Sequence, residues 1–223
     1  MKNNINSGFS LIELSIVLII MGFLIAGVTG GQSLIEAAKL RAEIDTIRDI
    51  KQSVYAFYNK NGRLPGDLDE DGMIDTDDYD GFSGVFDGVE ISEYVVPFAD
   101  MYLDGISIKG FDTSKADSDT CGSTTLSKCL PRAKIDSSAV YILQYIRSNN
   151  AYANHDAGDY LILSDYYEIK LNTKDMQSID IKIDDGVMDT GQFITVFGTD
   201  YEDYQEAIDN GELARAGLIP IDI

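Results

Sequence analysis

Phe9 to Val28 reads FSLIELSIVLIIMGFLIAGV, a stretch whose only polar side chains are two serines and Glu13. As an α-helix, a segment of this length spans about 30 Å, the thickness of a bilayer's hydrocarbon core. A secretory signal places its small-residue cleavage site after such a stretch. Here Ser7 and Gly8 lie before it, so cleavage at that point leaves the apolar helix on the mature chain. Lys2 and the α-amine favour a cytoplasmic leader, so we expect the rest of the chain to be translocated.

The charges are distributed unevenly along the chain. The 223 residues contain 17 Lys and Arg against 38 Asp and Glu, a net charge of −21. Residues 32–63 hold six bases and four acids, whereas residues 64–223 hold ten bases and 33 acids. This balance argues against direct nucleic-acid binding, which needs a basic patch. One histidine, no tryptophan and two cysteines also disfavour a His-centred active site, a structural zinc site and the class of soluble cytoplasmic enzymes.

Glu13 is the one charged side chain in the apolar stretch. A carboxylate inside a membrane helix costs about 3 kcal/mol or more unless it finds a partner, which makes such a residue a functional candidate. The alternative interpretation is a glutamate near the helix end whose carboxylate reaches the membrane interface.

The segment Gly8-Phe9-Ser10-Leu11-Ile12-Glu13-Leu14, followed by an unbroken apolar helix, resembles the prepilin signature of type IV pilins and of secretion pseudopilins. The resemblance implies that a membrane peptidase cuts between Gly8 and Phe9 and that the new amino group of Phe9 is methylated. It also implies that Glu13 pairs with the N-terminal amine of a neighbouring subunit during filament assembly. The physics agrees, because two charges buried in an apolar core must be paired, and such a pair fixes register.

The N-terminal helix is expected to continue to about Asn61 and to end at the breaker Leu64-Pro65-Gly66. No Gly or Pro occurs between Gln32 and Asn61, and apolar residues recur there at spacings of three and four: Ala37, Leu40, Ile44, Ile47, Ile50, Val54 and Phe57. The opposite face is predicted to be polar, with Lys39, Arg41, Glu43, Asp45, Arg48 and Asp49. The alternative is a separate core helix that follows a loop at Gly30-Gly31.

Beyond this helix the pattern predicts a small sheet, short helices and acidic loops. Strands are expected at 160–163, 167–171 and 193–197. Helices are expected at 138–147, 173–186 and 201–216, and a short strand or helix near 91–101. The predicted fold class is therefore α+β, with one long helix packed on a small antiparallel sheet, and the resemblance implies that this fold is pilin-like. The expected divisions are a leader (1–8), a transmembrane and assembly helix (9–31) and a globular domain (32–223).

The acidic segment 67–78, DLDEDGMIDTDD, fits a twelve-residue calcium loop position by position. The expected ligands are the side chains of Asp67, Asp69 and Asp71, the backbone carbonyl of Met73, Asp75 through a water, and Asp78 in the last position. Gly72 permits the sharp turn and Ile74 lies behind the metal. Composition alone predicts roughly 0.005 such matches in the chain, but a solvated acidic turn is the alternative. Asp at the last position resembles dockerin-like loops, and the lack of an exit helix predicts a structural calcium rather than a switch.

A second acidic segment, Asp184-Asp185-Gly186 with Asp189, lacks the metal-loop pattern because Ile181 and Ile183 fall at the first two ligand positions. Gly186 is instead predicted to end the preceding helix in a left-handed conformation. The segments LPGD at 64–67 and IDDG at 183–186 also resemble those of a subset of pilin-like proteins.

Cys121 and Cys129 are predicted to form a disulfide, because a translocated domain meets an oxidising compartment. Closing so short a loop is worth about 2.5 kcal/mol, and free or metal-binding thiols are the alternatives. His155 lies in the polar stretch AYANHDAGD and is expected to be an exposed loop residue rather than a base or a ligand, because no nucleophile accompanies it.

Three classes of function are hypotheses for a chain with these features. The resemblance implies a non-enzymatic structural subunit of a type IV pilus or of a type II secretion-like pseudopilus, whose partners are prepilin peptidase, other pilin subunits, the inner-membrane assembly platform and membrane lipid. The alternative is a minor pilin or a membrane-anchored, calcium-dependent adhesin. An anchored hydrolase using Asp184 and Asp185 lacks a nucleophile–base set. The expected location is a single pass of the inner membrane with a periplasmic domain, followed by a pilus or pseudopilus filament.

Overall fold

The computed structural model describes residues 11–74, 84–86, 89–91, 93–111, 129–147, 155–164, 171–197 and 203–222, of which 84–86, 89–91 and 93 are described by their backbone alone. The chain separates into two compact units, Met1–Lys39 and Leu40–Ile223. The expected boundaries at residues 8 and 31 remain predictions.

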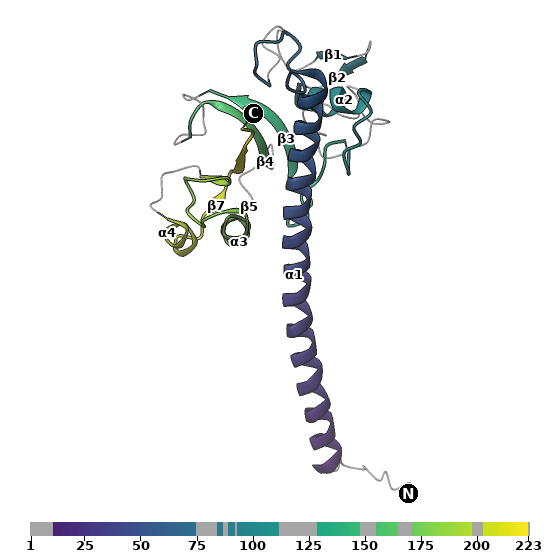
Figure 1. Cartoon of the computed structure of the whole chain (residues 1–223). Helices are drawn as coiled ribbons and strands as arrows, with labels where there is room; N and C mark the ends of the chain where they lie inside the picture. Colours follow the sequence, from purple (N-terminus) through teal and green to yellow (C-terminus); the bar gives the residue numbers. More distant parts are fainter. Residues whose placement is uncertain are drawn as a thin grey trace, which may run out of the picture. The chain divides into compact units, whose positions relative to one another are not determined.

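Helix α1 runs from Leu11 to Asn61 (Figure 1). It continues through Gly30 and Gly31, although each glycine costs a helix about 1 kcal/mol relative to alanine, so the alternative of a separate core helix is wrong. The helix ends at Gly62, whose φ of +73° is a left-handed conformation and whose N–H donates to the carbonyl of Tyr58 at 2.8 Å. The predicted end near Asn61 is therefore confirmed.

The main sheet of the second unit has four antiparallel strands in the order β3-β4-β8-β6. These are β3 (Val140–Ile146), β4 (Gly158–Ser164), β8 (Ala216–Pro220) and β6 (Ile194–Val196). The register is continuous across the sheet, since Ile142 lies opposite Ile162, Ile162 opposite Leu218, and Leu218 opposite Ile194. Two further pairs join β1 (Gly84–Phe86) to β2 (Val89–Ile91) and β5 (Leu171–Asn172) to β7 (Leu213–Ala214).

Short helices complete the second unit: the 3₁₀ helix η1 (Glu93–Val95), α2 (Val96–Leu103), α3 (Thr173–Ile183) and α4 (Tyr204–Asp209). The N-terminus of α3 is capped by Asn172, whose side chain accepts from the N–H of Lys174. Helix α3 contacts α4 and the strands β5, β6 and β7. The pilin-like α+β class predicted from the sequence is therefore confirmed.

The core of the second unit joins one face of α1 to the sheet. Ile47, Ile50, Val54 and Phe57 of α1 are buried and belong to the same apolar cluster as the strand residues. The predicted apolar face is therefore correct between Ile44 and Phe57. Glu43, predicted on the polar face, is instead fully buried, because it lies one helical turn before Ile47 on the same side.

Two predicted helices are wrong in type or length. Residues 140–146 (VYILQYI) form a strand, since a short run that is apolar at nearly every position fits a buried strand as well as a helix. The helix expected at 201–216 stops at Asp209, because Asn210-Gly211 makes a turn with Gly211 at φ +71°, and two strands follow. The strands near 160–163 and 193–197 are confirmed, while most of the strand expected at 167–171 lies outside the described residues.

Candidate functional site

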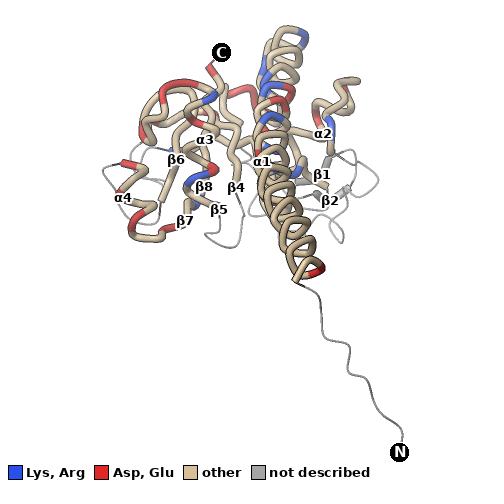
Figure 2. The backbone as a smooth tube through the Cα atoms, turned by 90° about the horizontal axis from the view of Figure 1, so that it is seen from below, with Lys and Arg blue, Asp and Glu red and all other residues tan. Residues whose placement is uncertain are grey.

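The first part of α1 carries large apolar side chains that are exposed. Large hydrophobic residues are exposed from Leu11 to Ile35, with Leu11 at 86% and Leu34 at 73%. Within the described part of the chain, α1 is the helix long and apolar enough to cross a membrane. Figure 2 shows that this part of the helix is almost free of charge, apart from Glu13 in the first turn. The predicted processing residues Gly8 and Phe9 lie outside the described residues.

The turn after α1 is buried in the second unit. Leu64, Pro65, Gly66 and Asp67 are all buried, although they follow an exposed helix end. Gly66 has a φ of +85°, and a Cβ built there would lie 2.8 Å from the side chain of Pro97. Only glycine fits this conformation and this close approach to α2. The LPGD segment therefore fixes where the acidic loop begins.

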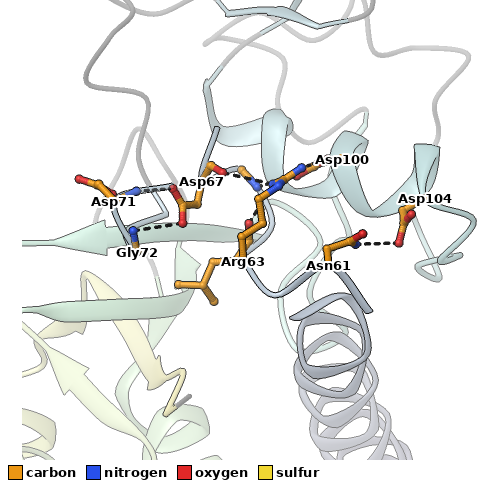
Figure 3. A network of polar contacts seen from close by, with 9 residues as sticks. Asn61, Arg63, Asp67, Asp71, Gly72, Asp100 and Asp104 are labelled. Atoms are coloured by element: carbon orange, nitrogen blue, oxygen red, sulfur yellow. Dashed lines mark hydrogen bonds and ion pairs between the residues drawn. The ribbon is translucent and has the colours of Figure 1, made fainter. Parts of the chain in front are cut away.

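An ion pair holds this turn against α2 (Figure 3). The guanidinium of Arg63 makes two bonds to the carboxylate of Asp100, at 2.6 Å and 3.0 Å, and Asp100 also accepts from the N–H of Gly66 at 3.0 Å. Arg63 also donates to the carbonyl of Asp67 at 3.2 Å and lies 5.1 Å from the ring centre of Phe57. The hydrogen bond to Asp100 raises the pKa of Arg63 above its usual value. Such a bidentate pair fixes orientation as well as charge.

The start of the acidic loop is arranged around the side chain of Asp67. Its two carboxylate oxygens accept from the N–H groups of Asp71 and Gly72, both at 3.1 Å. Gly72 has a φ of +87°, and Asp71 accepts from the N–H of Met73 at 2.9 Å. Carboxylate oxygens of Asp67, Asp69 and Asp71 lie within 4.8 Å of one another. The structure thus brings the first three predicted ligands close together, whereas their binding of calcium stays a prediction.

The carboxylates of this cluster influence the pKa of Asp67. Burial raises the pKa of Asp67, and the neighbouring Asp69 and Asp71 add to the increase, while hydrogen bonds from the backbone oppose it. Carboxylate oxygens keep lone pairs free beyond these backbone bonds. The arrangement is therefore suited to a cation that would offset the negative charge.

Ile74 joins the loop to the main sheet. Its side chain is buried, its N–H donates to Asp159 Oδ1 at 2.7 Å, and its carbonyl accepts from the N–H of Tyr145 at 2.7 Å. The predicted position of Ile74 behind the cluster agrees with this burial. Asp75 and Asp78, the remaining predicted ligands, lie outside the described residues.

Sequence reasoning missed the residues that anchor the loop, namely Arg63, Asp100 and Asp159. A signal existed for Asp100, since it is an acid within an apolar stretch (YVVPFADMYL). No local pattern marks Asp159, which meets the loop only through the tertiary fold.

The second acidic segment forms a separate cluster after α3. Carboxylate oxygens of Asp180, Asp184 and Asp185 lie within 4.8 Å of one another. Gly186 has a φ of +76°, which confirms the predicted left-handed residue after the helix. Asp180, however, was not predicted, and it is the fully buried member of this cluster.

The other predicted site residues are only partly described. Cys129 is fully buried, whereas Cys121 lies outside the described residues, so the disulfide stays a prediction. His155 is half-buried rather than exposed, with its ring packed edge-on against Tyr160 at 5.4 Å between centroids.

In the described part of the chain, an apolar helix long enough to cross a membrane is joined in sequence to a small α+β domain, an arrangement consistent with a pilin-like fold. Residues 3–29 match the family model described as the prokaryotic N-terminal methylation motif, which is the prepilin-type signature of type IV pilins and pseudopilins. The resemblance inferred from Gly8 to Leu14 is thereby confirmed. No curated protein and no solved structure matches the chain. The motif indicates processing by prepilin peptidase, assembly with other pilin subunits and a structural role.

Proposed function

We propose that this protein is a structural subunit of a type IV pilus or of a type II secretion-like pseudopilus. The observation that supports the proposal is a single one: the methylation motif at 3–29 coincides with a helix that carries large exposed apolar side chains from Leu11 to Ile35. A helix of this kind is stable in lipid before assembly and in a bundle of equivalent helices afterwards.

The processing and assembly steps follow from the motif. The peptidase cuts between Gly8 and Phe9, and the amine of Phe9 is methylated. The domain that follows α1 is periplasmic, because Lys2 keeps the leader on the cytoplasmic side. Glu13 then pairs with the N-terminal amine of a neighbouring subunit, which offsets the cost of a carboxylate in an apolar environment. The inner-membrane assembly platform would extract the subunit into the filament.

Calcium is the proposed structural ion of the loop that starts at Asp67. Three observations support a fit: the convergence of Asp67, Asp69 and Asp71 within 4.8 Å, the positive φ of Gly72, and the raised pKa of Asp67. Hard oxygen ligands of this kind suit calcium. The Met73 carbonyl, Asp75 and Asp78 would complete the ligand set.

The disulfide between Cys121 and Cys129 belongs to the same proposal. Cys129 is fully buried in the second unit, where an oxidised sulfur packs as an apolar group. Non-reducing and reducing peptide maps of the exported protein would separate the disulfide from two free thiols.

A minor subunit with a binding role is the second candidate. It is supported by an open polar cavity of about 680 Å³ beside β4 and β8, whose lining includes Asp156, Asp159, Asp189 and Asp222. Subunit abundance separates the two candidates, because a major subunit dominates sheared filaments whereas a minor subunit is scarce.

The test of the proposal is mass spectrometry of the N-terminal peptide from sheared filaments. We expect a chain that starts at a methylated Phe9, and an uncut chain in cells without the peptidase. Filaments whose subunits retain Met1 would contradict the proposal. Imaging wild-type and deletion cells would then distinguish a pilus from a secretion pseudopilus.

A further inference from the structure

Asp180 is a buried carboxyl group that accepts hydrogen bonds from two uncharged donors. Its side chain is fully buried in α3. One oxygen accepts from the hydroxyl of Tyr204 at 2.7 Å and the other from the N–H of Gly186 at 3.2 Å. Tyr204 is bonded in turn to the hydroxyl of Thr195 at 2.6 Å. This chain of contacts links α3 to α4 and β6.

Asp184 brings a second carboxylate to the same place. Its Oδ2 accepts from the N–H groups of Gln192 and Phe193, the latter at 3.2 Å. Its Oδ1 is buried and makes no hydrogen bond to a donor in the described part of the chain. A Cβ at Gly191 would lie 1.9 Å from the carboxylate, so the turn closes tightly over it. A buried carboxylate oxygen without a donor is costly.

A proton held between the two carboxyl groups removes this cost. A protonated Asp180 is a donor, and Asp184 Oδ1 is an acceptor that otherwise lacks one. We propose that Asp180 and Asp184 share one proton in the folded protein, and that this pair makes the packing of α3 against α4 and β6 sensitive to pH. The proposal does not depend on the filament function.

The charged surroundings favour the shared proton. Among the described residues, the ionisable groups shown in contact or in a cluster with Asp180 are Asp184 and Asp185 of the turn and Tyr204 of α4. The strands β5, β6 and β7, which also contact α3, contain no ionisable residue. The carboxylates of Asp180 and Asp184 accept hydrogen bonds from a hydroxyl and from backbone N–H groups. When the oxygens of two carboxylates lie within 4.8 Å of one another in a largely buried place, protonation of one carboxylate is favoured.

The electrostatic shifts agree with this geometry. Burial, and then the hydrogen bond to Asp184, raise the pKa of Asp180 to about 7. Burial would also raise the pKa of Asp184, but the hydrogen bonds from Asp180, Gln192 and Phe193 outweigh it and hold that pKa below its usual value. Because an unfolded aspartate has a pKa of about 3.9, the folded state binds the extra proton between about pH 4 and pH 7. The stabilisation is therefore complete below pH 4 and is lost as the pH rises through 7.

The experiment compares the full chain in detergent micelles with its Asp180→Asn variant. Asparagine stays neutral and can donate to Asp184, but its amide nitrogen cannot accept the hydrogen bond that one carboxyl oxygen receives from Gly186 or Tyr204. This lost bond lowers the melting temperature of the variant by a similar amount at every pH. We therefore expect the melting temperature of the wild type, relative to that of the variant, to fall by about 5 °C between pH 5 and pH 8. The matched control is Asp189→Asn, which removes one exposed charge from the same turn outside the cluster; its difference from wild type should not change with pH.

A second measurement uses the wild type alone and keeps the proposal testable if Asp180→Asn fails to fold. In protein labelled with ¹³C at aspartate, one carboxyl signal should titrate near pH 7, as the apparent value of the pair. Titration of every aspartate below pH 5 would overturn the proposal, as would parallel melting curves of wild type and variant. A calcium-dependent rise in melting temperature at pH 8 that Asp180→Asn alone removes would assign the pair to a cation and would also overturn it.

Discussion

The carboxylate of Glu43 in α1 accepts a hydrogen bond from the hydroxyl of Tyr141 in β3, and both side chains are fully buried. The other oxygen of Glu43 accepts from the N–H groups of Lys134 and Ile135, the latter at 2.9 Å. Burial, and then the charge of Glu43, raise the pKa of Tyr141 well above its usual value, so the hydroxyl remains a donor. Glu43 thus connects α1 both to β3 and to Lys134 and Ile135, which precede that strand.

Removing the Tyr141 hydroxyl should destabilise the second unit. In Tyr141→Phe, one oxygen of the buried Glu43 carboxylate loses its donor, and we expect the free energy of unfolding to fall by about 1–3 kcal/mol. Chemical denaturation of the full chain in detergent measures the change. The matched control is Tyr145→Phe, which removes a hydroxyl from a half-buried tyrosine of the same strand. Equal losses in the two variants would show that Glu43 does not depend on Tyr141.

The role of Glu43 shows where sequence reasoning succeeds and where it fails in this fold. The spacing of Ile47, Ile50 and Val54 correctly predicted the buried face of α1, because helical periodicity is a local property. The same reasoning fails for Glu43, because a charged residue type indicates an exposed position and Glu43 is buried. The donors that make its burial tolerable lie more than 90 positions away in the chain, and no local pattern reveals them.

The start of the candidate loop, like the buried face of α1, was predictable because its pattern is local in the sequence. The ligand spacing from Asp67 to Gly72 is local, and the structure brings these carboxylates together as predicted. The anchors of the loop, Asp100 and Asp159, are not local, and the sequence alone did not indicate them. The wrong prediction of a helix at 138–147 has the same cause, because this segment becomes a strand through its pairing with β4, which is distant in the sequence.

Breaking the Arg63–Asp100 pair should loosen the turn that starts the acidic loop. In Arg63→Gln, Asp100 keeps the N–H of Gly66 but loses both bonds to the guanidinium. We expect unfolding free energy to fall by about 2–4 kcal/mol, because the remaining carboxylate is largely buried. The control is Lys60→Gln, which breaks the exposed pair with Asp104 and should have no measurable effect. Equal stability of both variants would mean that the Arg63 pair contributes no more than a surface contact.

Replacing Glu13 should prevent assembly without preventing membrane insertion. The apolar helix is sufficient for insertion, whereas the carboxylate supplies the proposed contact with a neighbouring amine. In Glu13→Ala we expect an unchanged amount in the membrane fraction and a filament yield reduced about tenfold or more, since the loss of about 1.4 kcal/mol already changes an equilibrium tenfold. The control is Glu36→Ala, at an exposed position of the same helix beyond the apolar stretch. Normal filaments from Glu13→Ala would remove this residue from the mechanism.

Calcium should stabilise the second unit through the loop that starts at Asp67, and more strongly at neutral than at acid pH. Because the folded pKa of Asp67 is raised, the metal-free loop is most stable when this group is protonated and becomes less stable as the pH rises through that value. Calcium offsets the negative charge that appears when Asp67 loses its proton. The stabilisation by calcium should therefore grow as the pH rises through the pKa of Asp67. Extracellular sites bind with dissociation constants on the order of 10⁻⁴ to 10⁻³ M, and at a hundredfold excess over that constant the gain is about 2.7 kcal/mol.

The measurement is the melting temperature of the full chain with calcium, with magnesium and with chelator, at pH 5 and at pH 7. We expect a calcium-specific rise at pH 7 that shrinks at pH 5, because protons compete for the carboxylates. Asp69→Asn combined with Asp71→Asn should abolish the rise, since two of the three converging ligands lose their charge. The control, Asp189→Asn combined with Glu212→Gln, removes the same amount of charge from exposed positions elsewhere. This control variant should still show the calcium-specific rise in melting temperature. If wild type and the Asp69/Asp71 variant melt alike in all three buffers, the loop is an acidic turn and holds no ion.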